Sequence, residues 1–266
     1  MSVIGPYPPP PDSWIESPVT PGPPDLIPGL LPRTGHLLIA GETEVGKTLV
    51  ALEIAQAILT GDPLWGYITP AATVGHVTYI LGEHHEDTLR LLWRKMGLQA
   101  PSETLRLIGP QEHRVLTSRG ELMKGNRDTY AAWCQGSGLV IFDPLNAFAA
   151  GIDVENDSTA MRACINAMGF VAHQAGAALL ILAHMGKPHV DQKTGQTWQR
   201  GSYAARGSSA IEDAATCVFY MTRDEQVQDL YRLTRRKFKG DAPPFHVLKR
   251  DPLTLRQTYV LAQGCQ

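Results

Sequence analysis

Residues 41–48 read Gly41-Glu-Thr-Glu-Val-Gly46-Lys47-Thr48 and match the P-loop pattern GxxxxGK[ST] at every fixed position. The apolar run 36–41 (HLLIAG) predicts a buried strand, and residues 46–60 carry apolar side chains at helical spacing. A glycine-rich turn between a strand and a helix can cradle phosphates, because its N–H groups and the helix N-terminus face the same point. The stretch therefore predicts a nucleotide site on an α/β fold.

Each residue type in this loop has a role in binding ATP and Mg²⁺. Lys47 is expected to reach the β- and γ-phosphates and to assist catalysis, and the hydroxyl of Thr48 is expected to bind Mg²⁺. We predict that the nucleotide is contacted by the whole segment, namely Gly41, Glu42, Thr43, Glu44, Val45, Gly46, Lys47, Thr48 and Leu49.

Short apolar runs alternate with helical stretches from residue 36 to residue 183. The runs at 77–82, 105–108, 139–143 and 178–183 predict strands, and the stretches at 87–96, 121–134 and 158–175 predict helices. Such alternation is typical of a mostly parallel sheet that helices cover on both faces.

The pattern changes after residue 203. Strand-like runs at 214–222, 230–238, 245–249 and 255–261 follow one another with no helix between them, separated by turn residues. We predict an antiparallel extension at the sheet edge, and one ATPase domain over residues 35–266.

Residues 1–34 form a separate proline-rich arm in this prediction. They hold 11 of the 20 prolines, which fix φ and remove backbone donors, so neither a helix nor a central strand is expected. The arm is either a disordered leader or a segment that lies on a neighbouring subunit. In the second case Trp14, Ile15 and Leu26 would be its apolar anchors.

Composition is that of a globular protein, with 43% hydrophobic and 19% charged residues. A net charge of −2 excludes a uniformly basic coat for nucleic acid, so any such contact needs a local patch. The four cysteines form no CxxC pair, and there is no signal peptide or span-length apolar stretch. We expect a soluble, cytoplasmic protein without a membrane partner.

Three polar residues follow the predicted strands at the edge where the P-loop lies. Asp143 ends the run LVIFD, the Walker B pattern, and would hold Mg²⁺. Glu83 follows the strand 77–82 and could activate the attacking water. His184 follows the strand 178–183 and could sense the γ-phosphate.

This arrangement resembles the RecA-like ATPase core, and within it the RepA-type hexameric replicative helicases, relatives of the DnaB-type ring helicases. The resemblance covers roughly residues 25–250. It rests on the stretches GETEVGKT, YILGEHHED, LVIFDPLNAF, LILAHMGKP and, most selectively, ARGSSAIEDAA at 205–215.

The resemblance implies roles for further residues. Glu83 matches the catalytic glutamate, His184 the γ-phosphate sensor, and Arg206 the arginine finger that reaches a neighbour's ATP. Lys237 and Lys239 match a hairpin tip that ring relatives direct at the adjacent nucleotide. Lys239 stands where those relatives have arginine, so Arg206 is the expected finger.

Single-stranded DNA would pass through the channel of such a ring, lined by loops at about 146–157 and 185–203. The second loop carries the expected DNA-binding residues Lys187, Lys193 and Arg200, with Trp198 among them. The sequence thus predicts an ATP-dependent hexameric helicase or translocase on single-stranded DNA, acting in replication. The alternatives are a RecA/RadA-like recombination ATPase and a KaiC-like regulatory ATPase without DNA binding, which the near-neutral charge favours.

Overall fold

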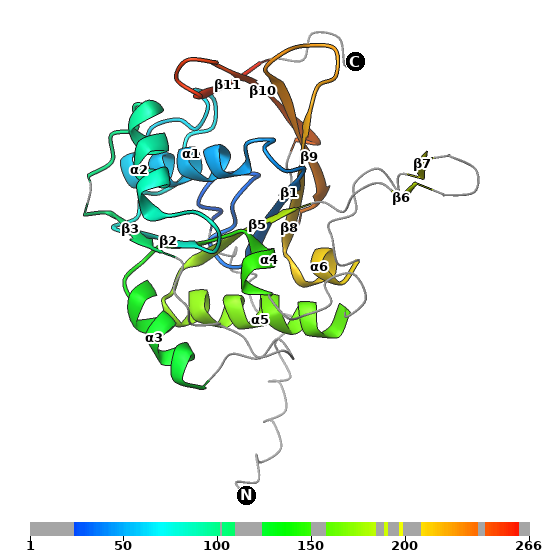
Figure 1. Ribbon diagram of the computed structural model, residues 1–266. Coiled ribbons are helices and arrows are strands. Elements are labelled where there is room, and N and C mark those ends of the chain that lie inside the picture. Colours follow the sequence, from blue (N-terminus) through cyan, green and yellow to red (C-terminus); the bar gives the residue numbers. More distant parts are fainter. Residues whose placement is uncertain are drawn as a thin grey trace, which may run out of the picture.

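A nine-stranded sheet forms the centre of the computed structural model (Figure 1). The structure describes residues 24–101, 103–109, 124–149, 158–184, 189–190, 197–198, 209–238 and 243–260. The strand order is β11-β10-β9-β8-β1-β5-β4-β2-β3. The strands are β1 (His36–Gly41), β2 (Val77–Leu81), β3 (Leu105–Ile108), β4 (Leu139–Asp143), β5 (Ala178–His184), β8 (Cys217–Arg223), β9 (Leu230–Lys237), β10 (Phe245–Arg250) and β11 (Gln257–Tyr259).

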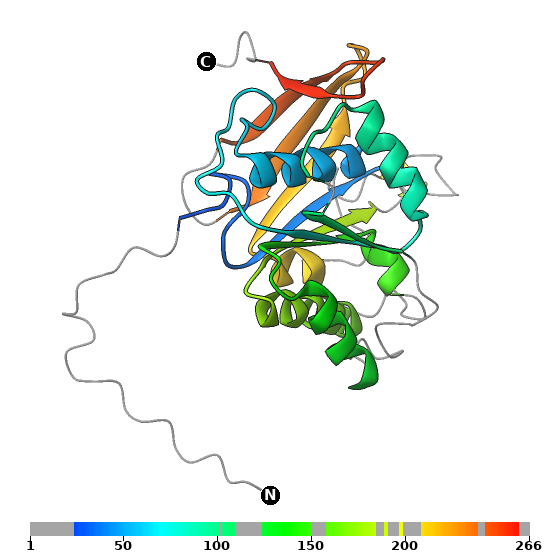
Figure 2. The same cartoon turned by 90° about the vertical axis from the view of Figure 1, so that its left-hand side faces the viewer.

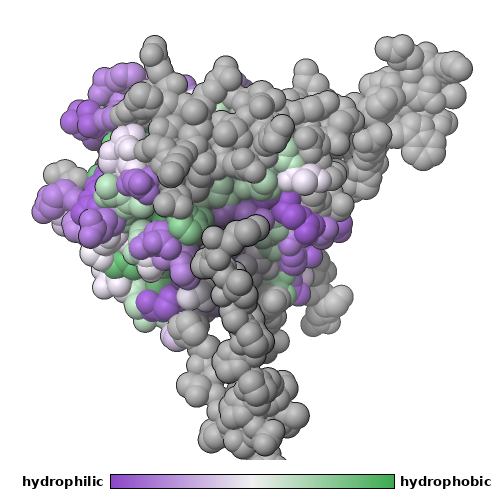
Figure 3. All heavy atoms as spheres, turned by 90° about the horizontal axis from the view of Figure 1, so that it is seen from below, coloured by the Kyte–Doolittle hydropathy of each residue, from purple (hydrophilic) through white to green (hydrophobic). Residues whose placement is uncertain are grey.

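Helices cover both faces of this sheet, as Figures 1 and 2 show. They are α1 (Lys47–Thr60), α2 (Glu86–Lys95), α3 (Lys124–Cys134), α4 (Leu145–Phe148), α5 (Ser158–Gln174) and α6 (Ser209–Ala214). Strand β1 shows how one sequence serves two layers: Leu37 and Ile39 join the core under α1, while Leu38 and Ala40 join the core over α5. The face seen from below mixes hydrophilic margins with more apolar residues between them (Figure 3).

The predicted fold class is confirmed: the sheet is mostly parallel, with helices on both faces and a C-terminal antiparallel extension. The extension begins one strand later than the sequence suggested. Strand β8 runs parallel to β1, and only β9, β10 and β11 are antiparallel. The cause is the short helix α6, which the sequence analysis missed and which ends at Ala214, so that β8 starts at Cys217.

Two other short elements were also unexpected. Helix α4 follows Pro144 directly, and β6 (His189–Val190) pairs with β7 (Thr197–Trp198) in a separate two-stranded sheet. Single-turn helices and two-residue strands carry too little periodicity to be read from sequence. Among the described residues, no helix is long and apolar enough to cross a membrane.

The described end of the proline-rich segment packs on the core of its own chain. Leu26, Ile27, Leu30 and Leu31 are buried in the cluster under α1, and the carbonyl of Leu26 accepts a hydrogen bond from the Ala71 N–H at 2.9 Å. Leu26 is therefore not available as an anchor on a neighbouring subunit. The other two predicted anchors, Trp14 and Ile15, lie outside the described residues.

Candidate nucleotide-binding site

The sheet brings the polar strand ends to one edge. Gly41 at the end of β1 is in register with His184 on β5, and Leu81 on β2 is in register with Asp143 on β4. Strands β5 and β4 lie between β1 and β2, so His184 and Asp143 come closer to the P-loop than the order along the chain suggests. Glu83 follows β2 by two residues and completes the row.

The P-loop has the backbone that phosphate binding requires. Gly46 lies at φ 106°, in the left-handed region that favours glycine, and caps α1 without a side-chain hydrogen bond. At Gly41, a Cβ would lie 2.6 Å from the backbone oxygen of Met221, so β8 leaves no room for a side chain there. The first N–H groups of α1 have no partner within the helix, and an anion can satisfy them.

The ammonium group of Lys47 lies inside the loop. Its Nζ donates to the carbonyls of Gly41 at 3.0 Å and Glu42 at 2.7 Å, and lies 3.4 Å from Nδ1 of His184. The side chain is only 5% exposed. Burial lowers the pKa of Lys47 to about 8, against the opposing charges of Asp143 and Glu83. A bound triphosphate would supply the negative charge that this site lacks.

Asp143 accepts two hydrogen bonds on one carboxylate oxygen. The Thr48 hydroxyl donates to Oδ2 at 2.8 Å, and the Tyr79 hydroxyl donates to the same atom at 2.6 Å. Asp143 is 4% exposed and Tyr79 is fully buried. Burial, followed by the charge of Asp143, raises the pKa of Tyr79 well above its usual range, so Tyr79 stays a neutral donor.

Glu83 and His184 are close enough to act together. Nε2 of His184 lies 3.8 Å from Oε2 of Glu83, while its other ring nitrogen faces Lys47. Glu83 is exposed, as a group that contacts water must be. The imidazole thus connects the predicted water-activating carboxylate to the predicted phosphate-binding ammonium.

Sequence analysis missed two residues of this site, Tyr79 and Arg250. Tyr79 alternates with Thr78 and Ile80 in a strand buried on both faces, and its apolar neighbours hide its polar function. Arg250 ends β10, and its Nη2 donates to the carbonyl of Val45 in the P-loop at 2.7 Å. No local signal could have linked two residues that are 205 positions apart.

The predicted hairpin-tip residue Lys237 has partners in its own chain. Its Nζ donates to the carbonyls of Glu212 and Asp213 at 3.1 Å each, so it caps the C-terminus of α6. A role at a neighbour's nucleotide stays a prediction. The remaining predicted residues lie outside the described part of the chain: Arg206, Lys239, Lys187, Lys193 and Arg200.

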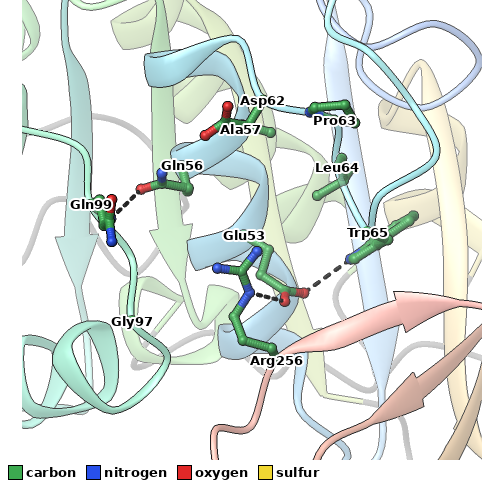
Figure 4. A pocket seen from close by; sticks show the side chains of 10 residues that line it. All are labelled: Glu53, Gln56, Ala57, Asp62, Pro63, Leu64, Trp65, Gly97, Gln99 and Arg256. Carbon is green, nitrogen blue, oxygen red and sulfur yellow. Dashed lines mark hydrogen bonds and ion pairs between the residues drawn. The ribbon is translucent and has the colours of Figure 1, made fainter.

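A cavity of about 220 Å³ lies elsewhere, beside the body of α1 and away from the P-loop. Its centre is Glu53, which accepts from Nε1 of Trp65 at 3.0 Å and lies 3.4 Å from Nε of Arg256 (Figure 4). The Gln257 N–H on β11 also donates to Glu53, at 2.8 Å. This cluster fastens the C-terminal extension to α1.

The family model described as an AAA domain matches residues 6–190, which is more than half of the chain. The chain belongs to this family. It is a P-loop ATPase domain, which implies nucleotide binding through the P-loop described above. No curated protein sequence matches the chain.

Two solved structures show the same fold at low sequence identity. The flagellar accessory protein FlaH from Methanocaldococcus jannaschii is 14% identical, with a TM-score of 0.57 over 86% of this chain and 90% of that one. The ATPase domain of a helicase is 13% identical, with a TM-score of 0.58 over 86% of this chain and 85% of that one. The fold of this ATPase domain is therefore RecA-like.

Proposed function

We propose that this domain hydrolyses ATP with Mg²⁺ and uses the energy to move along single-stranded DNA as a hexameric ring, acting as a replicative helicase. The observation that carries the hydrolytic part is the convergence of the Lys47 ammonium, the Thr48–Asp143 pair and the Glu83–His184 pair on one sheet edge. This set contains a phosphate-binding cation, a metal-binding oxygen pair and a base.

The donors present fit a magnesium ion. A hydroxyl and a carboxylate 2.8 Å apart, both oxygen ligands, are what Mg²⁺ takes in sites that also include substrate phosphates. Thr48 and Asp143 would hold the ion, and bound Mg²⁺ would neutralise charge that develops on the phosphates. Lys47 would exchange its two carbonyl partners for phosphate oxygens.

Glu83 is the base in this mechanism, and His184 reports the state of the nucleotide. Glu83 would orient the attacking water and accept its proton. Because His184 lies between Glu83 and Lys47, loss of the γ-phosphate would change the charge on both sides of its ring. The strand β5 then leads into the predicted DNA-binding loop, which gives a physical route from hydrolysis to DNA.

Action on DNA is supported by the resemblance to ring helicases in the stretches LVIFDPLNAF and ARGSSAIEDAA. In this proposal Arg206 completes a neighbour's site, as do Lys237 and Lys239 at the hairpin tip. Lys187, Lys193 and Arg200 bind the DNA backbone.

The test is ATP hydrolysis by the purified protein with and without single-stranded DNA, together with its mass in solution with Mg²⁺ and ATP. Stimulation by DNA and a mass near six chains would support the ring motor. Charge reversal at Lys193 and Arg200 should then abolish the stimulation and leave the basal rate in place. Hydrolysis that ignores DNA, from a monomer or dimer, would refute the DNA motor but leave the ATPase in place.

A second candidate is a regulatory ATPase that acts through a protein partner. The structural likeness to a flagellar accessory protein and the net charge of −2 favour it. DNA binding that is weak and independent of salt would support this function, because phosphate contacts make true DNA binding strongly salt-dependent.

A further inference from the structure

Arg250 at the end of β10 reaches across the sheet to the P-loop. It is 8% exposed, and its guanidinium lies over the ring of Tyr231 at 3.8 Å from the centroid. Nη1 donates to the Tyr231 hydroxyl at 2.8 Å, and Nη2 donates to the carbonyl of Val45 at 2.7 Å. Both ends of the planar fork are thus fixed, one by the extension and one by the P-loop.

The bond to Val45 determines where the next N–H points. In a planar trans peptide the carbonyl of Val45 and the N–H of Gly46 point in opposite directions. A carbonyl that is held toward Arg250 therefore directs the Gly46 N–H away from β10, to the side where the loop can receive an anion. Gly46 also caps α1, so the same contact orients the helix N-terminus.

The absence of a side chain at Gly46 makes this contact possible. A Cβ built there would occupy the space of Nη2 of Arg250. The left-handed φ of Gly46 gives one reason for glycine, and the guanidinium gives a second, independent reason.

We propose that Arg250 is a positioning residue of the nucleotide site, which holds the Val45–Gly46 peptide in the orientation that binds phosphate. It acts through the backbone and does not contact the nucleotide. The proposal rests on nucleotide binding by the P-loop and not on any action on DNA. It also gives the antiparallel extension a role in the site, since Arg250 and Tyr231 come from β10 and β9.

The experiment compares three variants with a matched control. Arg250→Met removes both donors and keeps the bulk, Arg250→Lys keeps the charge but loses the planar fork, and Tyr231→Phe removes one partner. Glu53→Gln is the control, because it weakens a different contact between the extension and α1, away from the P-loop. Equilibrium titration with a fluorescent ATP and a fluorescent ADP gives the dissociation constants, and circular dichroism confirms folding.

We expect Arg250→Met to raise both dissociation constants by about tenfold or more, since a charge-assisted hydrogen bond orients the loop. Arg250→Lys should recover part of the affinity, and Tyr231→Phe should lose a few-fold. Glu53→Gln should stay within about twofold of the wild type, even if its melting temperature changes.

A folded Arg250→Met protein that binds both nucleotides within about twofold of the wild type would overturn the proposal. If that variant does not fold, wild-type affinity in both Arg250→Lys and Tyr231→Phe overturns it instead. A wild type that binds no nucleotide overturns this proposal and the ATPase together. Weakened binding in the Arg250 variants supports it even where DNA fails to stimulate hydrolysis, because no DNA enters this assay.

Discussion

Removing one buried hydroxyl, by Tyr79→Phe, should weaken the metal site without touching the P-loop. The Tyr79 hydroxyl donates to Oδ2 of Asp143 at 2.6 Å, and Thr48 donates to the same atom at 2.8 Å. When Thr48 binds Mg²⁺ its hydroxyl turns to the ion, and Tyr79 is then the donor that orients the carboxylate.

The size of the effect follows from the type of bond. A hydrogen bond to a charged, buried acceptor contributes about 1.5–3 kcal/mol, and 1.4 kcal/mol is about a factor of ten in an equilibrium constant. We expect the Mg²⁺ concentration for half-maximal ATP hydrolysis to rise about tenfold in Tyr79→Phe. Nucleotide binding measured in EDTA should not change, because the P-loop contacts remain.

Tyr130→Phe is the matched control. Tyr130 is also buried and packs on Phe142, the residue before Asp143, in the core over α5. Successive side chains of a strand point to opposite faces, so this ring lies on the face of β4 away from the carboxylate. The measurement is a MgCl₂ titration of the hydrolysis rate for both variants, with thermal unfolding alongside. A Tyr79→Phe protein with wild-type Mg²⁺ dependence and wild-type stability would refute the argument that this hydroxyl orients Asp143.

Three further predictions concern the groups whose charge the site depends on. Glu83→Gln should lower hydrolysis by about 10²-fold or more while nucleotide affinity stays within a few-fold, and a rate loss below about tenfold would exclude Glu83 as the base. ATP affinity should fall about tenfold per pH unit above about pH 8, because burial lowers the pKa of Lys47 and phosphate needs the ammonium form; a dissociation constant that is flat between about pH 7 and 9.5 would contradict this. Burial raises the pKa of Glu53 from 4.5 to about 7, so the folded chain holds a proton that the unfolded chain releases, and the free energy of unfolding should fall by at most about 3 kcal/mol as pH rises from 4.5 to 7. Urea unfolding of Glu53→Gln should lack this fall, and equal slopes in both proteins would rule out Glu53 as its source.

Local sequence was enough to predict the parts of the site that lie on one strand or one turn. The P-loop fits its pattern because adjacent residues make the cradle, and Asp143 and Glu83 follow runs that could only be buried strands. Strand order was not predictable in this way, because β1 pairs with β5 and β8 through contacts far apart in sequence. This order places His184 directly beside Gly41.

The residues that sequence missed share one physical property, which is that they act on a motif from outside it. Tyr79 orients Asp143 from the neighbouring strand β2, and Arg250 orients Val45 from β10. Motif patterns record the atoms that face the ligand, whereas the groups that hold those atoms in place can come from any element that packs nearby. The C-terminal extension therefore has two contacts with the nucleotide unit: the guanidinium on the P-loop and the Glu53 cluster on α1. Because the first contact sets the direction of an N–H group and the second only joins two elements, we expect nucleotide affinity to depend on Arg250 and stability to depend on both.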